Sequence, residues 1–136
     1  DVKASRGLGD VYKRQVTIYG CRSMIEEDAI QILQFDCTMF GGFTNGKKLS
    51  ALCELNHIDV APHHDCYIHA PLVASTPAGR IVESFDDERD PLQAQLFENP
   101  HKMSDGWIHL NEKPGLGLEI SDAALKKFGK LVYKNK

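Results

Sequence analysis

The sequence predicts an α/β fold built on parallel strands, and three observations indicate it. Short apolar runs alternate with helical patterns in the order β-α-β-α-β. Three of these runs end at Asp36, His63 and Glu83, and the intervals of 27 (36 to 63) and 20 (63 to 83) residues each fit one strand, loop and helix unit. Since the carboxyl ends of parallel strands meet at one edge, we expect two acids and a histidine to surround one small volume, which indicates an enzyme.

The first fifteen residues differ in kind from the rest of the chain. Residues 1–15 show no sustained period of 2 or 3.6 and carry four basic side chains. We interpret them as a non-native or disordered segment and leave them out of the fold argument.

Regular patterns begin after this segment. Residues 18–28 place apolar side chains on one helical stripe and acids on the other, which predicts a short helix. The continuous apolar run 30–35 predicts a strand buried on both faces. A loop follows, and a helix is expected over about 46–56, with Thr44 or Asn45 as its cap.

The next two strand–helix repeats follow the same order. A strand is expected at 58–62, a helix at about 66–76 that ends before a proline, and a third strand at 80–85. An acidic loop then interrupts the rhythm. In the remaining tail we expect a strand at 107–109 and a helix capped by Ser121.

Bulk properties bound the function. The chain has 136 residues, 42% hydrophobic and 26% charged, which suits one globular domain but not a complete (β/α)8 barrel of about 250 residues. A net charge of −3 gives no basic surface, so nucleic acid is not expected as a partner. No apolar stretch is long enough for a membrane span, and four cysteines without a C-x-x-C pair suit a reduced, cytoplasmic protein.

Two local alternatives stay open around the histidine. His64 is a rival to His63, and strand alternation would send the two rings to opposite sides, so that only one enters the site. His63, His64, Asp65 and Cys66, with His69 nearby, are all metal-ligand types. A closed zinc site usually joins spaced pairs from two segments, and no second pair is visible, so we expect His69 to pack on its helix.

Simpler roles are also open for the two acids. Asp36 follows a strand, where an acid commonly caps the next turn. Glu83 precedes an acidic loop and could be one more surface acid.

An ordered set of segments resembles the mandelate racemase/muconate lactonizing enzyme family of the enolase superfamily. Residues 34–36 with 40–44 resemble its sixth strand, 62–64 and 68–74 its seventh strand and helix, 76–83 its eighth strand, and 105–108 with 114–120 its C-terminal tail. Each segment alone is weak, but the ordered set with matching intervals is specific. The resemblance covers residues 16 to about 132.

The resemblance implies a fold. The family has a modified (β/α)7β barrel, a TIM-like barrel, closed by an N-terminal capping domain. Residues 16–136 would then form a partial enolase C-terminal-like barrel domain: the second half of the barrel, strands six to eight, plus the tail. We expect the capping domain and the first five strands to be missing, and the full-length parent to be a homo-oligomer.

The resemblance also implies a reaction. The shared first step of the family removes the proton beside a carboxylate. By position, Asp36 and His63 match the Asp–His dyad of the mandelate racemase-like subgroup, in which the acid holds one ring nitrogen of the base. Glu83 matches the acid that hydrogen-bonds the substrate carboxylate, for which it must carry or share a proton. Dehydration of a hydroxy or sugar acid is the expected activity. The alternatives are a racemase or epimerase of a hydroxy acid, or a non-catalytic relative.

The family's cofactor is Mg²⁺, and the resemblance implies that its ligands are absent from this chain. Family members hold the ion with three carboxylates on the third to fifth strands. The last of these falls near Tyr12 and Lys13, where no acid stands, and the lysine base of the second strand has no counterpart. Asp36 and Glu83 cannot replace a set of oxygen ligands. We therefore expect the chain by itself to be inactive.

Overall fold

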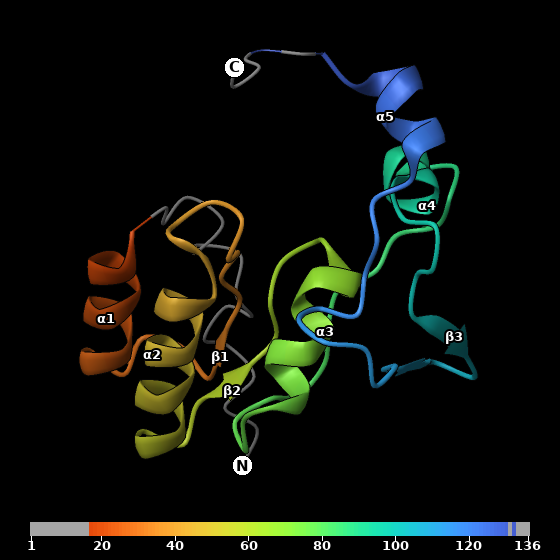
Figure 1. Ribbon diagram of the computed structural model, residues 1–136. Coiled ribbons are helices and arrows are strands. Elements are labelled where there is room, and N and C mark those ends of the chain that lie inside the picture. The colour runs from red at the N-terminus through yellow and green to blue at the C-terminus, as the bar shows by residue number, and fades with distance from the viewer. Residues whose placement is uncertain (1–16, 131, 133–136) are drawn as a thin grey trace. The chain divides into compact units, whose positions relative to one another are not determined.

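The computed structural model describes residues 17–130 and 132 (Figure 1). The expectation for residues 1–15 therefore lies outside the described residues. The chain divides into two compact units, an N-terminal unit that ends at Ser84 and a C-terminal unit that begins at Phe85. Each unit is described by itself.

The N-terminal unit alternates helices and short strands, as the sequence predicts. Its elements are α1 (Ile18–Glu26), β1 (Ile32–Leu33), α2 (Gly42–Leu55), β2 (Asp59–Val60) and α3 (Cys66–Ala74). The two strands pair in parallel, with Ile32 opposite Asp59 and Leu33 opposite Val60 (Figure 1). This confirms the expected parallel α/β arrangement.

The parallel pairing continues beyond the two short strands. The Ala61 N–H donates to the Leu33 carbonyl at 3.0 Å, and the His63 N–H donates to the Phe35 carbonyl at 2.8 Å. These bonds recur at every second residue, as a parallel ladder requires. The segment that ends at Asp36 is thus held beside the segment that ends at His63.

The expected third strand at 80–85 does not form. A single parallel bridge joins Val60 to Gly79, the Arg80 N–H donates to the Val60 carbonyl at 2.9 Å, and residues 80–85 form no strand. Regular pairing would next use an N–H of residue 62, which proline lacks. The register then slips by one residue: the N–H that reaches the Pro62 carbonyl belongs to Glu83, at 3.5 Å, where a regular ladder would use Val82.

Apolar side chains from both strands and all three helices form the core of this unit. The largest fully buried aliphatic and aromatic ones are Phe35, Leu33, Leu49, Leu72 and Val60. Cys53 is also fully buried, as its place on the apolar stripe of α2 predicts. The carboxyl ends of the paired segments are fixed to this core.

The start of α2 differs from the expectation. The helix begins at Gly42, and its N-cap is Gly41, which has a φ of 104° and no side-chain cap bond. Neither Thr44 nor Asn45 caps it; the Asn45 amide instead donates to the Phe40 carbonyl at 2.7 Å. A left-handed glycine turns the chain here, so the helix starts a turn earlier than a side-chain cap would set it.

The C-terminal unit contains α4 (Pro91–Leu96), β3 (Lys102–Ser104), β4 (Trp107–His109) and α5 (Asp122–Phe128). The strand at 107–109 and the Ser121 cap of α5, whose hydroxyl accepts from the Ala124 N–H, are confirmed. The sequence analysis did not find α4 or β3.

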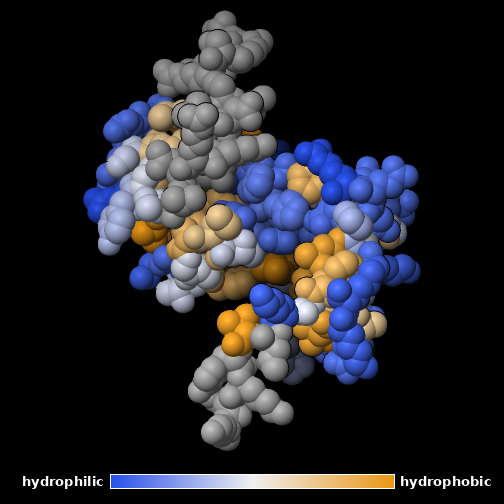
Figure 2. All heavy atoms as spheres, turned by 90° about the horizontal axis from the view of Figure 1, so that it is seen from above, coloured by the Kyte–Doolittle hydropathy of each residue, from blue (hydrophilic) through white to orange (hydrophobic). Residues whose placement is uncertain are grey.

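Many large apolar side chains of the C-terminal unit are exposed. Figure 2, coloured by residue hydropathy, shows hydrophobic residues at the surface of the molecule. Trp107 is 72% exposed and Phe128 is 48% exposed. None of the helices within residues 17–130 is both long and apolar enough to cross a membrane.

Candidate active site

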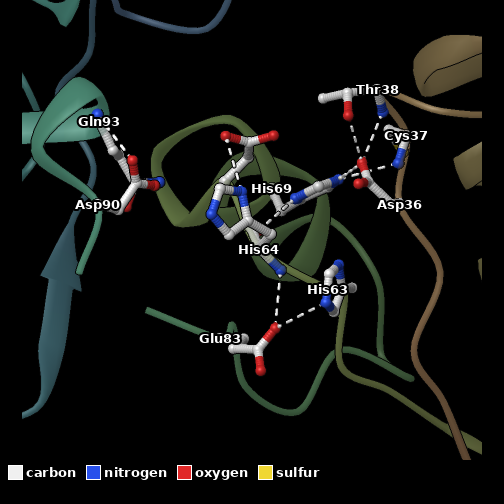
Figure 3. Close-up of polar contacts among 10 residues, drawn as sticks. Asp36, Cys37, Thr38, His63, His64, His69, Glu83, Asp90 and Gln93 are labelled. Atoms are coloured by element: carbon white, nitrogen blue, oxygen red, sulfur yellow. Dashed lines mark hydrogen bonds and ion pairs between the residues drawn. The ribbon is translucent and has the colours of Figure 1, made fainter. Parts of the chain in front are cut away.

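The three predicted site residues lie at the carboxyl ends of the three neighbouring segments of the N-terminal unit (Figure 3). Asp36 follows β1, His63 follows β2, and Glu83 follows the bridge at Gly79. Backbone bonds from His63 to Phe35 and from Glu83 to Pro62 hold the three ends side by side.

His63 and Glu83 face each other. The His63 Nε2 lies 3.6 Å from the Glu83 Oε2, which is within ion-pair range but longer than a good hydrogen bond. Their side chains are 32% and 26% exposed, so a small molecule can reach both. The same Glu83 oxygen accepts the His64 backbone N–H at 3.0 Å, which fixes the carboxylate.

Asp36 is fastened to its own loop. Its Oδ1 accepts the Thr38 N–H at 2.8 Å and the Thr38 hydroxyl at 2.7 Å. This is the turn-capping role that the sequence left open. The other Asp36 oxygen, Oδ2, makes no hydrogen bond with the described residues, so one carboxylate oxygen stays available.

The expected pairing of Asp36 with a ring nitrogen of His63 does not form in this structure. The nearest imidazole to Asp36 is His69, whose Nε2 lies 3.6 Å from Asp36 Oδ1. The bonds to Thr38 hold that oxygen in its own loop. The Nδ1 of His63 makes no hydrogen bond with the described part of the chain, and Figure 3 shows Nε2 as the nitrogen joined to Glu83.

His64 and Asp65 adopt an unusual backbone. Both have positive φ, 56° and 44°, which costs free energy in residues with a side chain. His64 is therefore not part of a strand, so the alternation argument that separated it from His63 does not apply. The ring centroids of His63 and His64 lie 6.0 Å apart, and the His64 Nδ1 lies 3.3 Å from the Asp65 carboxylate.

His69 is the site residue whose role the sequence analysis missed. It lies on α3 with no exposed surface. Its Nε2 accepts the Cys37 backbone N–H at 3.0 Å, and its Nδ1 lies 2.9 Å from the His64 carbonyl. Its position three residues after the buried Cys66 and three before the buried Leu72 indicated an inward side chain, but nothing in the sequence indicated two backbone partners.

A sequence profile of the family described as enolase C-terminal domain-like matches residues 12–124. The chain belongs to this family. Solved structures that it resembles are described as mandelate racemase/muconate lactonizing enzymes, which confirms the predicted resemblance.

Several relatives of this enolase-family chain are named as sugar-acid dehydratases or as members of a dehydratase family, and one is named as a D-galactarolactone cycloisomerase. A D-galactonate dehydratase family member from Oceanicola granulosus is 31% identical over 89% of this chain and 30% of that protein. A D-mannonate dehydratase from Caulobacter vibrioides is 28% identical over 93% of this chain and 32% of that protein. The chain therefore spans about a third of the length of the curated relatives it matches.

Two solved enolase-family structures support the same fold. A mandelate racemase/muconate lactonizing enzyme from a marine actinobacterium, in complex with magnesium, aligns with a TM-score of 0.79 and 28% identity, covering 85% of this chain and 33% of that one. An L-talarate dehydratase from a Polaromonas species, complexed with Mg and L-glucarate, aligns with a TM-score of 0.70 and 27% identity, covering 81% and 29%.

The family implies Mg²⁺, but the residues described here do not form its site. Within residues 17–130 no three His, Cys, Asp or Glu side chains lie together in a way that could hold a metal ion. One oxygen of Asp36 is bound to Thr38 and one of Glu83 to the His64 N–H, whereas Mg²⁺ requires a nearly octahedral set of oxygens. The same finding applies to a zinc site around His63, His64 and Cys66.

The cysteines next to the site have thiol pKa values above the ordinary range. The four cysteines are free and buried. Burial, together with the neighbouring Asp36 charge, raises the pKa of Cys37 to about 11. Burial and hydrogen bonding act in opposite directions on Cys66, and burial prevails, so its pKa is also raised. A thiolate nucleophile is therefore not favoured at either position.

Proposed function

We propose that this chain forms part of a dehydratase of sugar acids, in which His63 is the general base. The observation that carries the proposal is the pair formed by the His63 Nε2 and the Glu83 Oε2 at 3.6 Å, partly exposed at the ends of paired parallel segments. The relatives include a D-galactonate dehydratase family member and dehydratases of D-mannonate, D-gluconate and L-talarate. We place residues 16–136 as strands six to eight and the tail of the barrel.

The first step is removal of the proton beside the substrate carboxylate. That proton is very weakly acidic, so the reaction needs a base with a suitable pKa and stabilisation of the charge that develops on the carboxylate oxygens. The His63 Nε2 is the proposed acceptor because it faces the same accessible space as Glu83. Glu83, carrying or sharing a proton, donates a hydrogen bond to the substrate carboxylate that enters between them.

Asp36 is proposed to support the other nitrogen of the base. With Nε2 facing the substrate, Nδ1 must carry a proton and needs an acceptor when the ring becomes an imidazolium. The Oδ2 of Asp36, which is not bound to Thr38, is the proposed acceptor for that proton in the substrate complex. Asp36 then fixes the tautomer of His63.

The second step expels the β-hydroxyl. The C–H electron pair becomes a C=C bond as the C–O bond breaks, and the hydroxyl takes a proton and leaves as water. The imidazolium of His63 can return the proton that it removed, so the two steps balance. The enol product tautomerises to a 2-keto acid. The residues present do not form the Mg²⁺ site, and we propose that the 136-residue chain alone is inactive.

The test uses the full-length protein that contains this chain, assayed with Mg²⁺ on D-galactonate, D-mannonate, D-gluconate and L-talarate. We expect 2-keto acid from at least one of them. The substitution His63→Asn should lower kcat by ~10²–10⁴-fold, the usual contribution of a positioned base. The matched variant His64→Asn should change kcat by less than about tenfold, since its ring is not the proposed base.

Other outcomes reassign the site. Exchange of the α-proton without keto acid would make the protein a racemase or epimerase. Full activity of the His63→Asn variant would overturn the assignment of the base. No exchange and no product with any hydroxy or sugar acid would favour the non-catalytic relative.

A further inference from the structure

We propose that His69 is a positioning residue that fixes the loops of Asp36 and His63 relative to each other through one buried imidazole. This inference rests on the proposed function, because it assigns His69 a part in aligning the base with its two acids. His69 itself reaches no substrate, since its side chain is fully buried.

The hydrogen bonds of His69 define its protonation state. The Cys37 backbone N–H can only donate, so the His69 Nε2 that receives it at 3.0 Å must carry a lone pair. The proton of the neutral ring is then on Nδ1, which donates to the His64 carbonyl at 2.9 Å. Both ring nitrogens are used, and each partner is a backbone group next to a proposed catalytic residue. A buried imidazole with both nitrogens satisfied is held rigidly.

The second partner of His69 is a strained residue. His64 has a φ of 56°, a conformation that persists only when its surroundings hold it. Its carbonyl receives the His69 Nδ1–H, and its N–H donates to the Glu83 Oε2 at 3.0 Å. The peptide groups on both sides of this residue are therefore fixed, one by His69 and one by Glu83 (Figure 3).

These contacts make a continuous path between the two acids. Asp36 is followed by Cys37, whose N–H binds His69; His69 binds His64, which binds Glu83. The path passes around His63 without using its ring. It sets the distance between the loops and leaves the base free to react. The neighbouring Asp36 Oδ1, 3.6 Å from the His69 Nε2, is too far for a good hydrogen bond and is already bound to Thr38.

Two substitutions at His69 each keep one of its two hydrogen bonds and remove the other. His69→Gln can place a carbonyl oxygen near the Nε2 position and keep an acceptor for Cys37 while losing the donor to His64. His69→Asn can place an N–H near Nδ1 and keep the donor to His64 while losing the acceptor. His69→Leu removes both. His57→Asn, an exposed histidine of the same unit with positive φ, is the control, since asparagine tolerates that backbone.

In the full-length enzyme, we expect His69→Leu to lower kcat ~10–100-fold with KM changed less than about threefold, because small misplacements of a catalytic group slow the reaction strongly. The Gln and Asn variants should each recover part of the loss, and His57→Asn should match the parent. These values are taken per folded molecule, with the folded fraction measured by circular dichroism. A folded His69→Leu variant with unchanged kcat would overturn the proposal.

A second measurement tests the two hydrogen bonds of His69 without a substitution at His69. In the parent protein labelled with ¹⁵N-histidine, the ring signals of His69 at pH 8 should show a protonated Nδ1 and an unprotonated Nε2. A proton on Nε2, or a doubly protonated ring, would contradict the two backbone bonds. If this tautomer is seen but the His63→Asn variant stays active, the proposed function is wrong, whereas the two backbone hydrogen bonds of His69 are confirmed. If the tautomer is absent and the His63→Asn variant is inactive, the positioning role of His69 is wrong and the proposed role of His63 remains.

Discussion

The two units of the chain bury their apolar side chains to different extents. The N-terminal unit encloses Phe35, Leu33 and Leu49 completely. Among the described residues of the C-terminal unit, Ala124 is the buried apolar side chain, and His101 is the buried polar one. The large apolar side chains that this unit exposes are Leu92, Met103, Trp107, Leu110, Ile120, Leu125, Phe128 and Val132. The proposed active site lies in the N-terminal unit, which has a buried apolar core of its own. The C-terminal unit gains little stabilisation from burial.

The largest predicted effect is in the core beneath the site. Phe35→Ala should lower the free energy of unfolding by about 3–5 kcal/mol, because it removes a fully buried ring and leaves a cavity. Trp107→Ala, which truncates an aromatic ring that is 72% exposed, should cost less than about 1 kcal/mol. Urea unfolding of both variants measures the difference. Equal losses would contradict the contrast between the units.

A smaller loss is expected where a helix contacts the Asp36 loop. A methyl group on Gly46 would come within 2.5 Å of the Cys37 Sγ and 3.0 Å of Leu72 Cδ2. Gly46→Ala should therefore destabilise the protein by about 1–3 kcal/mol, despite the better helix propensity of alanine. Lys48→Ala, an exposed position of the same helix, is the control and should have little effect. A gain in stability for Gly46→Ala would show that the contact relaxes freely.

The buried thiols predict a pH dependence that belongs to the N-terminal unit. The pKa of Cys37 is raised from 9.0 to about 11 and that of Cys53 to about 12, mainly by burial. A raised pKa favours the folded state below pH 9, and that stability is lost as the pH rises, because the unfolded chain ionises first. We expect a loss of about 1 kcal/mol per pH unit for each thiol between pH 9 and pH 11.

Urea unfolding at pH 8, 9, 10 and 11 measures this slope, and Cys53→Ala should reduce it. A slope that Cys53→Ala leaves unchanged would place the titrating groups elsewhere. The C-terminal unit has no cysteine and contributes nothing to this effect.

The smallest effect compares two equivalent helix caps. The Thr17 hydroxyl accepts the Gly20 N–H in α1, and the Ser121 hydroxyl accepts the Ala124 N–H in α5. Loss of such a cap typically costs about 1 kcal/mol. We expect Thr17→Ala to lower global stability, whereas Ser121→Ala should speed amide hydrogen exchange in α5 alone, because a weakly buried unit opens locally. A global loss from Ser121→Ala would show that the units unfold together.

The sequence predicted the parallel pairing of the first two strands because their apolar runs and the intervening helix follow simple periods. It did not predict the one-residue shift in the pairing register of the third segment. The cause is visible in the sequence, because Pro62 has no N–H to continue the ladder. The β3–β4 hairpin could also have been predicted from the sequence, because an Asp-Gly pair is typical of a two-residue hairpin turn. Asp105 and Gly106 form this turn, both with positive φ.

The site was less accessible to sequence reasoning than the fold. The order and spacing of Asp36, His63 and Glu83 indicated that they meet at one end of the segments. The partners of each side chain depend on local backbone geometry that no periodicity encodes. The left-handed conformation of His64 and the two backbone bonds of His69 are of this kind.

The most direct test of the account is exchange of the substrate α-proton in D₂O, followed by ¹H NMR on the full-length protein with its active sugar acid. If His63 removes this proton, the His63→Asn variant should bind Mg²⁺ as the parent does and incorporate no deuterium, while His64→Asn should still exchange. Deuterium incorporation by the His63→Asn variant at the parental rate would contradict the assignment of His63 as the base.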